Sequence, residues 1–192
     1  VHNGVVVKDA ASGETLAHRY LEAELYARAL AILRQAASPM LYVDHFPCSP
    51  PSSSVQREPE AIDILHEAGD RAHAFQAEYL HDNRAVAQQV DSLDAPGSRA
   101  LVMLSCMADE ASLRPLQREI EAQLAAHTRT HFLINKNYRG FILEVVSAAA
   151  GKWPALRALA EAEGIEPAEI VAVGDDENDA EMLAEAGLGI AM

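Results

Sequence analysis

Two periods of apolar residues alternate along the chain. Short apolar runs predict buried strands, and longer stretches with an apolar residue every three or four positions predict amphipathic helices. The predicted strands are residues 40–43, 99–106 and 131–134, and the predicted helices are residues 21–37 and 110–127. Helices that alternate with strands in this way are typical of an α/β fold.

The intervening segments are less regular. Residues 60–90 predict further helical stretches, with breaks at 69–70 and 81–83. Residues 48–55 are rich in proline and serine and predict a loop. The clearest helical face lies in the stretch 110–127. Its apolar positions are Leu113, Leu116, Ile120 and Leu124.

An acidic loop is predicted near the carboxyl end, after a short strand at residues 171–173. Residues 175–179 hold four carboxylates and one amide. Ligands of open α/β sheets bind at the carboxyl ends of strands, and Mg²⁺ prefers carboxylate, water and phosphate oxygens. Asp175 is the best candidate for a metal ligand and Asn178 for an uncharged phosphate contact. Asp179 is a candidate to orient a ligand or a lysine.

A second interpretation of this loop remains open. Carboxylates in the first turn of a helix stabilise it through the helix dipole, whether or not a metal is bound. The acidic residues alone do not decide between a metal site and a helix start.

Lys152 stands where another helix is predicted to begin. Pro154 suits a first helical turn, and the helical period continues to a stop at Gly164. Because a helix dipole does not favour a cation at this end, we expect an anion or carboxylates to hold Lys152. The alternative is an ordinary surface lysine.

Together, Lys152 and residues 174–183 resemble the third and fourth motifs of haloacid dehalogenase-like hydrolases, and the Cof-type phosphatases among them most closely. In that family the lysine follows a glutamate-containing strand, to which residues 140–146 are similar. The Asn3-Gly4 start with its following hairpin is also similar to the segment that precedes the family's cap domain.

The resemblance implies a fold and a chemistry. The fold is α/β, with a partial Rossmann-like core of parallel strands and flanking helices plus an inserted α/β cap domain. The chemistry is Mg²⁺-dependent phosphoryl transfer through an aspartyl-phosphate. Asp175 matches a metal ligand, Asp179 a supporting carboxylate that we also assign to the metal site, Lys152 the charge-neutralising lysine and Asn178 a phosphate-side contact.

The chain departs from the family pattern at the nucleophile. Two aspartates one residue apart, followed by glycine and threonine, do not occur; Asp44 leads to His45-Phe46, and Asp91 and Asp94 have the wrong spacing. The family's Thr-Gly-Arg motif is absent as well. We therefore expect an internal piece of a longer protein, which is inactive in isolation.

The resemblance also predicts a division of the chain. Residues 1–20 and 138–192 are expected in the catalytic core, and residues 21–137 in the α/β cap domain. Family caps close over the active site, so residues 135–139 and the loop around His45 are candidate substrate contacts. The composition of 135–139 is equally that of an ordinary turn, which is the interpretation we favour. Trp153, where relatives carry a small residue, is expected to pack against the sheet.

Charge and composition limit the classes of molecule that the protein is expected to bind. The formal net charge is −14, from 15 basic and 29 acidic residues, which argues against nucleic acid and anionic membranes. Cys48 and Cys106 lack metal-ligand spacing and predict a loop thiol and a buried strand residue. The histidines, His131 among them, are expected at surface or edge positions. No signal peptide or bilayer-spanning run is visible, so a cytoplasmic location is the expectation.

The sequence thus favours a Mg²⁺-dependent phosphatase of small phosphorylated metabolites such as sugar phosphates. Two alternatives stay open. One is a phosphomutase or sugar-phosphate phosphatase of the same superfamily, and the other is a non-catalytic module that keeps the acidic loop as a metal or ligand site.

Overall fold

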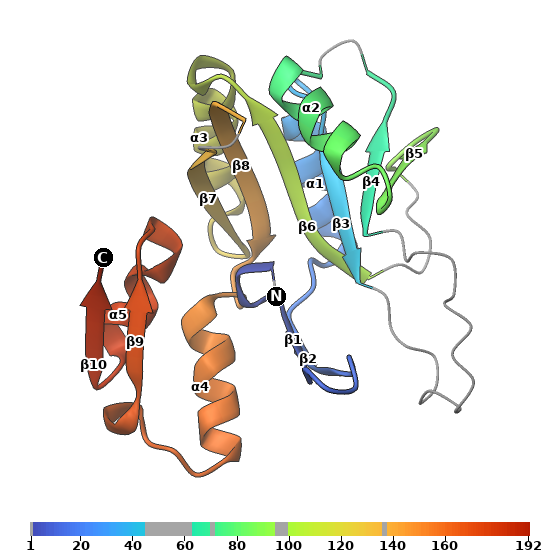
Figure 1. Cartoon of the computed structure of the whole chain (residues 1–192). Coiled ribbons are helices and arrows are strands. Elements are labelled where there is room, and N and C mark those ends of the chain that lie inside the picture. The colour runs from blue at the N-terminus through green and yellow to red at the C-terminus, as the bar shows by residue number, and fades with distance from the viewer. Residues whose placement is uncertain (1, 45–62, 70–71, 95–99, 136–137) are drawn as a thin grey trace, which may run out of the picture.

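The computed structural model describes residues 2–44, 63–69, 72–94, 100–135 and 138–192. Figure 1 shows a six-stranded sheet with its helices and, beside it, a smaller part built from the carboxyl-terminal segment, with the amino-terminal turn between them. The prediction of an α/β fold is confirmed. Within this described part, no helix has the length and apolar character needed to cross a membrane.

The six-stranded sheet is mainly antiparallel. Its order is β5-β4-β3-β6-β8-β7, and only the β4–β5 pair is parallel. The strands are β3 (Met40–Asp44), β4 (Ile64–Glu67), β5 (Ala87–Val90), β6 (Ala100–Ala108), β7 (Thr128–Asn135) and β8 (Gly140–Ser147). The predicted strands 40–43, 99–106 and 131–134 correspond to β3, β6 and β7.

Helices cover both faces of this sheet. On one face lie α1 (Ala23–Leu33) and α3 (Glu110–Leu124), and on the other lies α2 (Ala74–Asp82). The α3 helix begins at Asp109, whose carboxylate accepts the Ser112 backbone N–H at 2.8 Å, as an N-cap does. The predicted apolar face of α3 is confirmed, because all four of its leucine and isoleucine residues are buried in the core.

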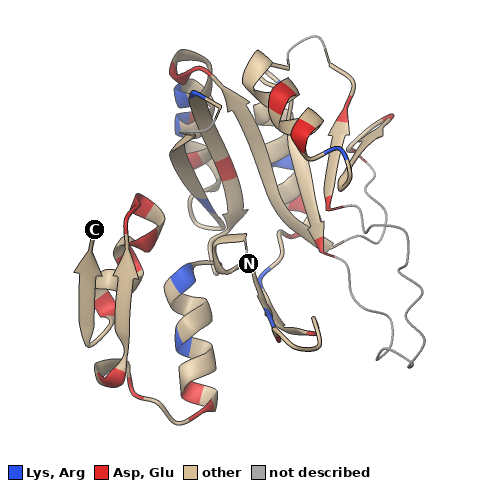
Figure 2. Cartoon of the chain, in the orientation of Figure 1, with Lys and Arg blue, Asp and Glu red and all other residues tan. Residues whose placement is uncertain are grey.

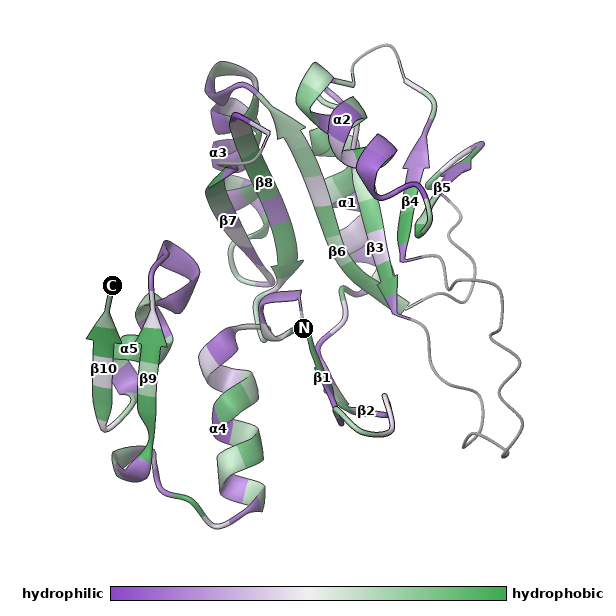
Figure 3. Ribbon diagram, in the orientation of Figure 1, coloured by the Kyte–Doolittle hydropathy of each residue, from purple (hydrophilic) through white to green (hydrophobic). Residues whose placement is uncertain are grey.

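The other elements lie outside the six-stranded sheet. The amino-terminal segment forms a 3-10 turn and a hairpin, and the smaller carboxyl-terminal part contains one long helix and a parallel strand pair with short helical segments. These elements are η1 (His2–Gly4), β1 (Val6–Lys8), β2 (Thr15–His18), α4 (Lys152–Ala162), η2 (Pro167–Glu169), β9 (Val171–Gly174), η3 (Glu177–Asp179), α5 (Ala180–Glu185) and β10 (Leu188–Ala191). The strands β9 and β10 pair in parallel and are strongly apolar (Figure 3).

Trp153 packs α4 against α5 and against the residue that precedes β9. This side chain is only 5% exposed and clusters with Ala160 and Ile170, with Met182 of α5 packed against the group. Trp153 is therefore a buried packing residue.

The prediction of helices throughout residues 60–90 is wrong at both ends. Residues 64–67 form β4 and residues 87–90 form β5, so that only α2 between them is helical. Pairing decides the outcome, since Ile64 and Leu65 align with Tyr42 and Leu41 of β3. Such short segments carry too little periodicity to separate helix from strand, and the neighbouring strand overrides the local preference.

Strand β8 bears on the predicted division of the chain. We assigned residues 138–192 to the catalytic core, yet β8 pairs with β6 and β7 in the six-stranded sheet. The division into 1–20 with 138–192, and 21–137, stays a prediction. The strand pairing favours a boundary after Ser147, because β8 lies between β6 and β7 in the larger sheet and pairs with both.

Candidate functional site

The acidic loop forms where β9 ends. Gly174 closes the strand, and a Cβ at this position would come within 2.4 Å of the Asp179 Cβ, so the loop requires glycine here. Asp176 then caps η3, because its carboxylate accepts the Glu177 backbone N–H at 2.8 Å. The chain turns back so tightly that Asp179 lies against the end of β9.

Lys152 and this loop meet. The Lys152 ammonium donates to Asp179 Oδ1 at 2.6 Å and to Asn178 Oδ1 at 3.1 Å. Asp179 is buried at 5% exposure, whereas the Lys152 side chain is one-third exposed. Figure 2 shows the acidic segments that follow β9 facing the basic start of α4. The carboxylate and the amide hold the lysine at the helix entrance, where the helix dipole alone would not.

The electrostatic state of Asp179 follows from these contacts. Burial by itself raises the pKa of a carboxyl, but the hydrogen bond from Lys152, the backbone N–H of Asp175 and the lysine charge together lower the pKa of Asp179 below its usual value. Asp179 is therefore ionised at neutral pH. Its two oxygens accept from Lys152 and from the Asp175 N–H, which lies 3.3 Å from Oδ2.

Asp175 is arranged differently from Asp179. It is exposed, and it contacts Asp179 through its backbone N–H and not through its carboxylate. The two carboxylates, with the amide oxygen of Asn178 nearby, are oxygen donors of the kind that suits Mg²⁺, which needs only one or two carboxylates beside water and phosphate oxygens. No group of three acidic, histidine or cysteine side chains with metal-binding geometry occurs in the part of the chain that is described. The metal roles of Asp175 and Asp179 stay predictions.

Asn178 is tied to the amino-terminal turn and, through it, to the larger sheet. Its Nδ2 donates to Asn3 Oδ1 at 3.0 Å, and Asn3 Nδ2 donates to Glu144 Oε2 at 2.6 Å. The turn is fixed by close packing, because a Cβ on Gly4 would lie 2.0 Å from the carbonyl oxygen of Gly151, just before Lys152. Residues far apart in sequence thus form one hydrogen-bonded chain.

Asn3 and Glu144 were not predicted as site residues. Asn3 entered the sequence analysis only through the Asn-Gly start of a hairpin, and Glu144 only as part of an apolar strand. The available signal was the carboxylate itself, since a glutamate inside the run 140–146 breaks an otherwise apolar pattern.

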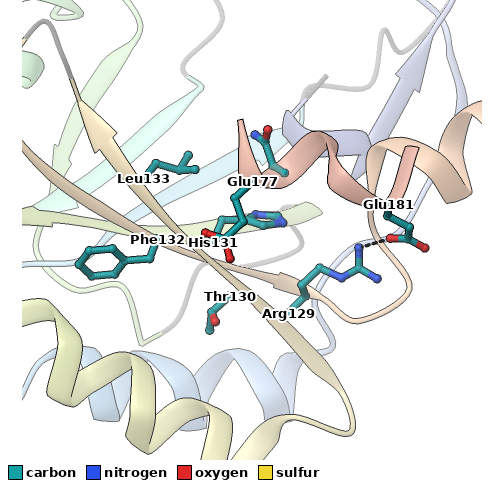
Figure 4. A pocket seen from close by; sticks show the side chains of 8 residues that line it. Arg129, Thr130, His131, Phe132, Leu133, Glu177 and Glu181 are labelled. Atoms are coloured by element: carbon teal, nitrogen blue, oxygen red, sulfur yellow. Dashed lines mark hydrogen bonds and ion pairs between the residues drawn. The ribbon is translucent and has the colours of Figure 1, made fainter. Parts of the chain in front are cut away.

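A cavity of about 180 Å³ lies beside this chain of contacts. Strand β7 forms one side of it, and η3 with the start of α5 forms the other. The lining residues are Arg129, Thr130, His131, Phe132, Leu133, Glu177, Asn178 and Glu181. Arg129 Nη1 and Glu181 Oε2, 2.7 Å apart, form an ion pair at one end of the cavity (Figure 4).

His131 lies at the sheet edge that was predicted for it, although its side chain is largely buried. It belongs to the edge strand β7, and its side chain is only 10% exposed. The reason is the neighbouring part of the molecule, because η3 and the amino-terminal turn cover this face of the sheet edge.

The other candidate contacts stand apart from this cavity. The Tyr138 backbone N–H donates to Asn135 Oδ1 at 3.1 Å, a contact typical of an Asn turn, and neither residue lines the cavity. Cys106 is fully buried in β6, as expected for a strand residue. His45 and Cys48 lie outside the described residues.

Comparison with known proteins places the chain among hydrolases. A family model described as haloacid dehalogenase-like hydrolase matches residues 1–192. A 53-residue segment is 45% identical to a phosphoglycolate phosphatase of Methanoculleus marisnigri, covering 28% of the chain and 23% of that protein. A 52-residue segment is 44% identical to the putative phosphatase YxeH of Bacillus subtilis, covering 27% of the chain and 19% of that protein.

Solved structures share the fold over nearly the whole chain. A haloacid dehalogenase-like hydrolase from Bacteroides thetaiotaomicron superposes with a TM-score of 0.69 at 19% identity, covering 99% of this chain and 63% of that one. TM0651 from Thermotoga maritima gives a TM-score of 0.68 at 20% identity, covering 99% of this chain and 62% of that one. The chain thus spans less than two thirds of these proteins, and the matched segments span about a quarter or less of the curated relatives.

Proposed function

Because the chain belongs to the haloacid dehalogenase-like hydrolase family, we propose that it forms part of a Mg²⁺-dependent phosphatase of small phosphorylated metabolites such as sugar phosphates. The nucleophile is the aspartate of the family's first motif, which does not occur among these 192 residues. Phosphatases among the curated relatives support the reaction class. The cytoplasmic location stays a prediction from the sequence.

One observation carries the proposal: Lys152, Asn178 and Asp179 lie in mutual contact beside an exposed carboxylate, Asp175. A transferring phosphoryl group spreads negative charge over its oxygens, and positioned cations and amides stabilise that charge. The site contains one ammonium and one side-chain amide within hydrogen-bonding distance of each other, as this reaction requires.

Each side chain has a defined part in the proposed reaction. Lys152 has three N–H donors, two of which point to Asn178 and Asp179, so the third is available to a phosphoryl oxygen or to the attacking carboxylate. Asn178 uses one amide hydrogen on Asn3 and keeps the other for a phosphoryl oxygen. Asp179 positions Lys152 and keeps it charged.

The acidic residues of the loop would hold the metal. Asp175 is the proposed Mg²⁺ ligand. Asp179, whose carboxylate accepts the Asp175 backbone N–H, is proposed as the second carboxylate. Mg²⁺ bound there supplies a Lewis acid for the phosphoryl oxygens and offsets the repulsion between a phosphate ester and a protein of net charge −14.

The test is hydrolysis of p-nitrophenyl phosphate, with and without Mg²⁺, by the protein that contains this chain together with the nucleophile motif. We expect Lys152→Met and Asp175→Asn each to lower kcat/KM by about 10³-fold, as loss of a charge-stabilising group does. Asp175→Asn should also raise the Mg²⁺ concentration that gives half-maximal activity.

Asp176→Asn is the matched control. It removes one negative charge from the same loop but keeps an N-cap for η3, so activity should stay within about threefold of the wild type. Equal activity of wild type and Asp175→Asn at every Mg²⁺ concentration would reject the assignment of Asp175 as a metal ligand. Transfer of the phosphate to a sugar instead of to water would favour the alternative function, a phosphomutase.

A further inference from the structure

The cavity beside Asn178 is lined by a histidine with a buried ring nitrogen that has no hydrogen bond to any described residue. His131 lines it from β7, and its side chain is nine-tenths buried. Its Nδ1 is the one buried side-chain polar atom left without a hydrogen-bond partner in the described parts of the chain. Buried polar groups are nearly always hydrogen-bonded, so His131 is a cavity-lining side chain whose hydrogen-bonding capacity the described residues leave partly unused.

Glu144 determines which ring nitrogen a ligand can use. It lies directly across from His131 on β8, and its Oε2 is 3.4 Å from Nδ1, close enough to attract a proton but without hydrogen-bond geometry. A carboxylate beside Nδ1 favours the tautomer that carries the proton there. Nε2 then becomes an acceptor, and it is the ring atom left for a ligand in the cavity.

We propose that His131 binds the leaving group of the phosphate ester, with its Nε2 accepting a hydrogen bond from a hydroxyl of that group. The proposal rests on the phosphatase function above. It identifies a side chain that recognises the part of the substrate other than the phosphate. The cavity suits this use because Asn178, the proposed phosphate contact, lines it together with His131.

Hydrogen bonds connect the two ends of such a substrate site. Glu144, which faces His131, accepts from Asn3, and Asn3 accepts from Asn178. Asn3 and Glu144 are therefore positioning residues that fix the histidine and the phosphate-side amide relative to each other. The rigid backbone at Gly4 keeps Asn3 in place.

The charges of the cavity favour a neutral leaving group. Arg129 is neutralised by Glu181, whereas among the described residues neither Glu177 in the lining nor Glu144 behind His131 pairs with a lysine or an arginine. A carboxylate on the leaving group would meet this negative potential and would offer no proton to Nε2. A hydroxyl meets neither difficulty.

The experiment uses three phosphate esters with the same two-carbon skeleton: 2-hydroxyethyl phosphate, ethyl phosphate and phosphoglycolate. With the protein that contains this chain and the nucleophile motif, kcat/KM should be about tenfold higher for the hydroxyethyl ester than for the ethyl ester, and lowest for phosphoglycolate. His131→Leu should bring the ratio of hydroxyethyl to ethyl ester to about one. His131→Gln, whose amide oxygen can stand near the Nε2 position, should retain part of the preference.

Thr130→Val is the matched control, since Thr130 lines the same cavity but its hydroxyl donates to Glu121 at 2.7 Å. The hydroxyethyl-to-ethyl ratio should be unchanged in this variant. An unchanged ratio in His131→Leu would overturn the proposal, as would a wild type that hydrolyses all three esters equally well. If His131→Leu does not fold, the ratio in His131→Gln and in Glu144→Gln decides, because both should reduce it. A wild type that hydrolyses none of the esters with Mg²⁺ would instead reject the phosphatase function itself.

Discussion

In the six-stranded sheet, the central strand β6 is buried along eight of its nine residues, because helices pack on one face and α2 with the amino-terminal segment pack on the other. The parallel pair β9–β10 is covered much less. Val171 and Leu188, which align with each other, are 61% and 54% exposed.

This difference matters for the site, because the acidic loop directly follows β9, whose side chains are more exposed than those of β6. Within these residues, β9 and η3 have fewer buried apolar contacts than the larger sheet to hold the loop in place. The contacts from Asn178 through Asn3 to Glu144 attach the loop to the well-packed sheet. The larger sheet therefore helps to position the site, although the proposed metal and phosphate ligands come from the smaller part.

The largest expected effect is a core truncation in the larger sheet. Leu143→Ala removes a fully buried side chain from β8 and should lower the free energy of unfolding by about 2–5 kcal/mol. Val173→Ala in β9, where the side chain is 49% exposed, should cost less than about 1 kcal/mol. Urea unfolding of the two variants measures the contrast, and equal losses would show that the two parts are equally packed.

The second-largest effect is expected where the amino-terminal turn η1 packs against the start of α4. Gly4→Ala places a Cβ against the Gly151 carbonyl at a positive φ of 82°, and should cost at least about 2 kcal/mol from strain and overlap. Gly13→Ala is the control, since its φ of 75° is similar but nothing lies within 4 Å. It should cost roughly 1 kcal/mol. If the two variants unfold at the same urea concentration, close packing of η1 on α4 contributes nothing.

The ion pair of the site should have a smaller, pH-dependent effect. Asp179→Asn should cost about 1–2 kcal/mol at pH 6, a value reduced because Lys152 is one-third exposed. The folded state lowers the pKa of Asp179 below its ordinary 3.8. The stabilisation is therefore present above pH 3.8 and lost as the pH falls through the folded-state pKa.

Urea unfolding from pH 3 to 6 checks this sign. The stabilities of wild type and Asp179→Asn should converge toward the acid end of the range. A gap that stays constant or widens on acidification would contradict the assignment of an ionised, lysine-paired Asp179.

The smallest effect is expected on the outer surface of α4. Arg157 pairs with Glu161 at 2.7 Å, but both side chains are more than half exposed. Arg157→Ala should change the unfolding free energy by less than about 0.5 kcal/mol. A loss as large as that of Asp179→Asn would mean that the buried position of Asp179 adds nothing to its ion pair.

The sequence by itself determined the elements with a strong local pattern. Short stretches of sequence were enough to predict the buried leucine and isoleucine positions of α3, the apolar strands β3 and β6, and the turn after Gly174. Lys152 and the acidic loop were found in the same way, because glycine, proline and clustered carboxylates mark helix starts and strand ends locally.

Only the tertiary structure decided the rest. Residues 64–67 form a strand because β3 offers them a partner, and residues 87–90 form one because they pair in turn with β4. The His131 side chain is largely buried because η3 and the amino-terminal turn cover an edge strand. The contact chain from Lys152 to Glu144 joins residues up to 175 positions apart. No local pattern encodes such pairings, since they depend on which surfaces meet once the apolar faces are buried.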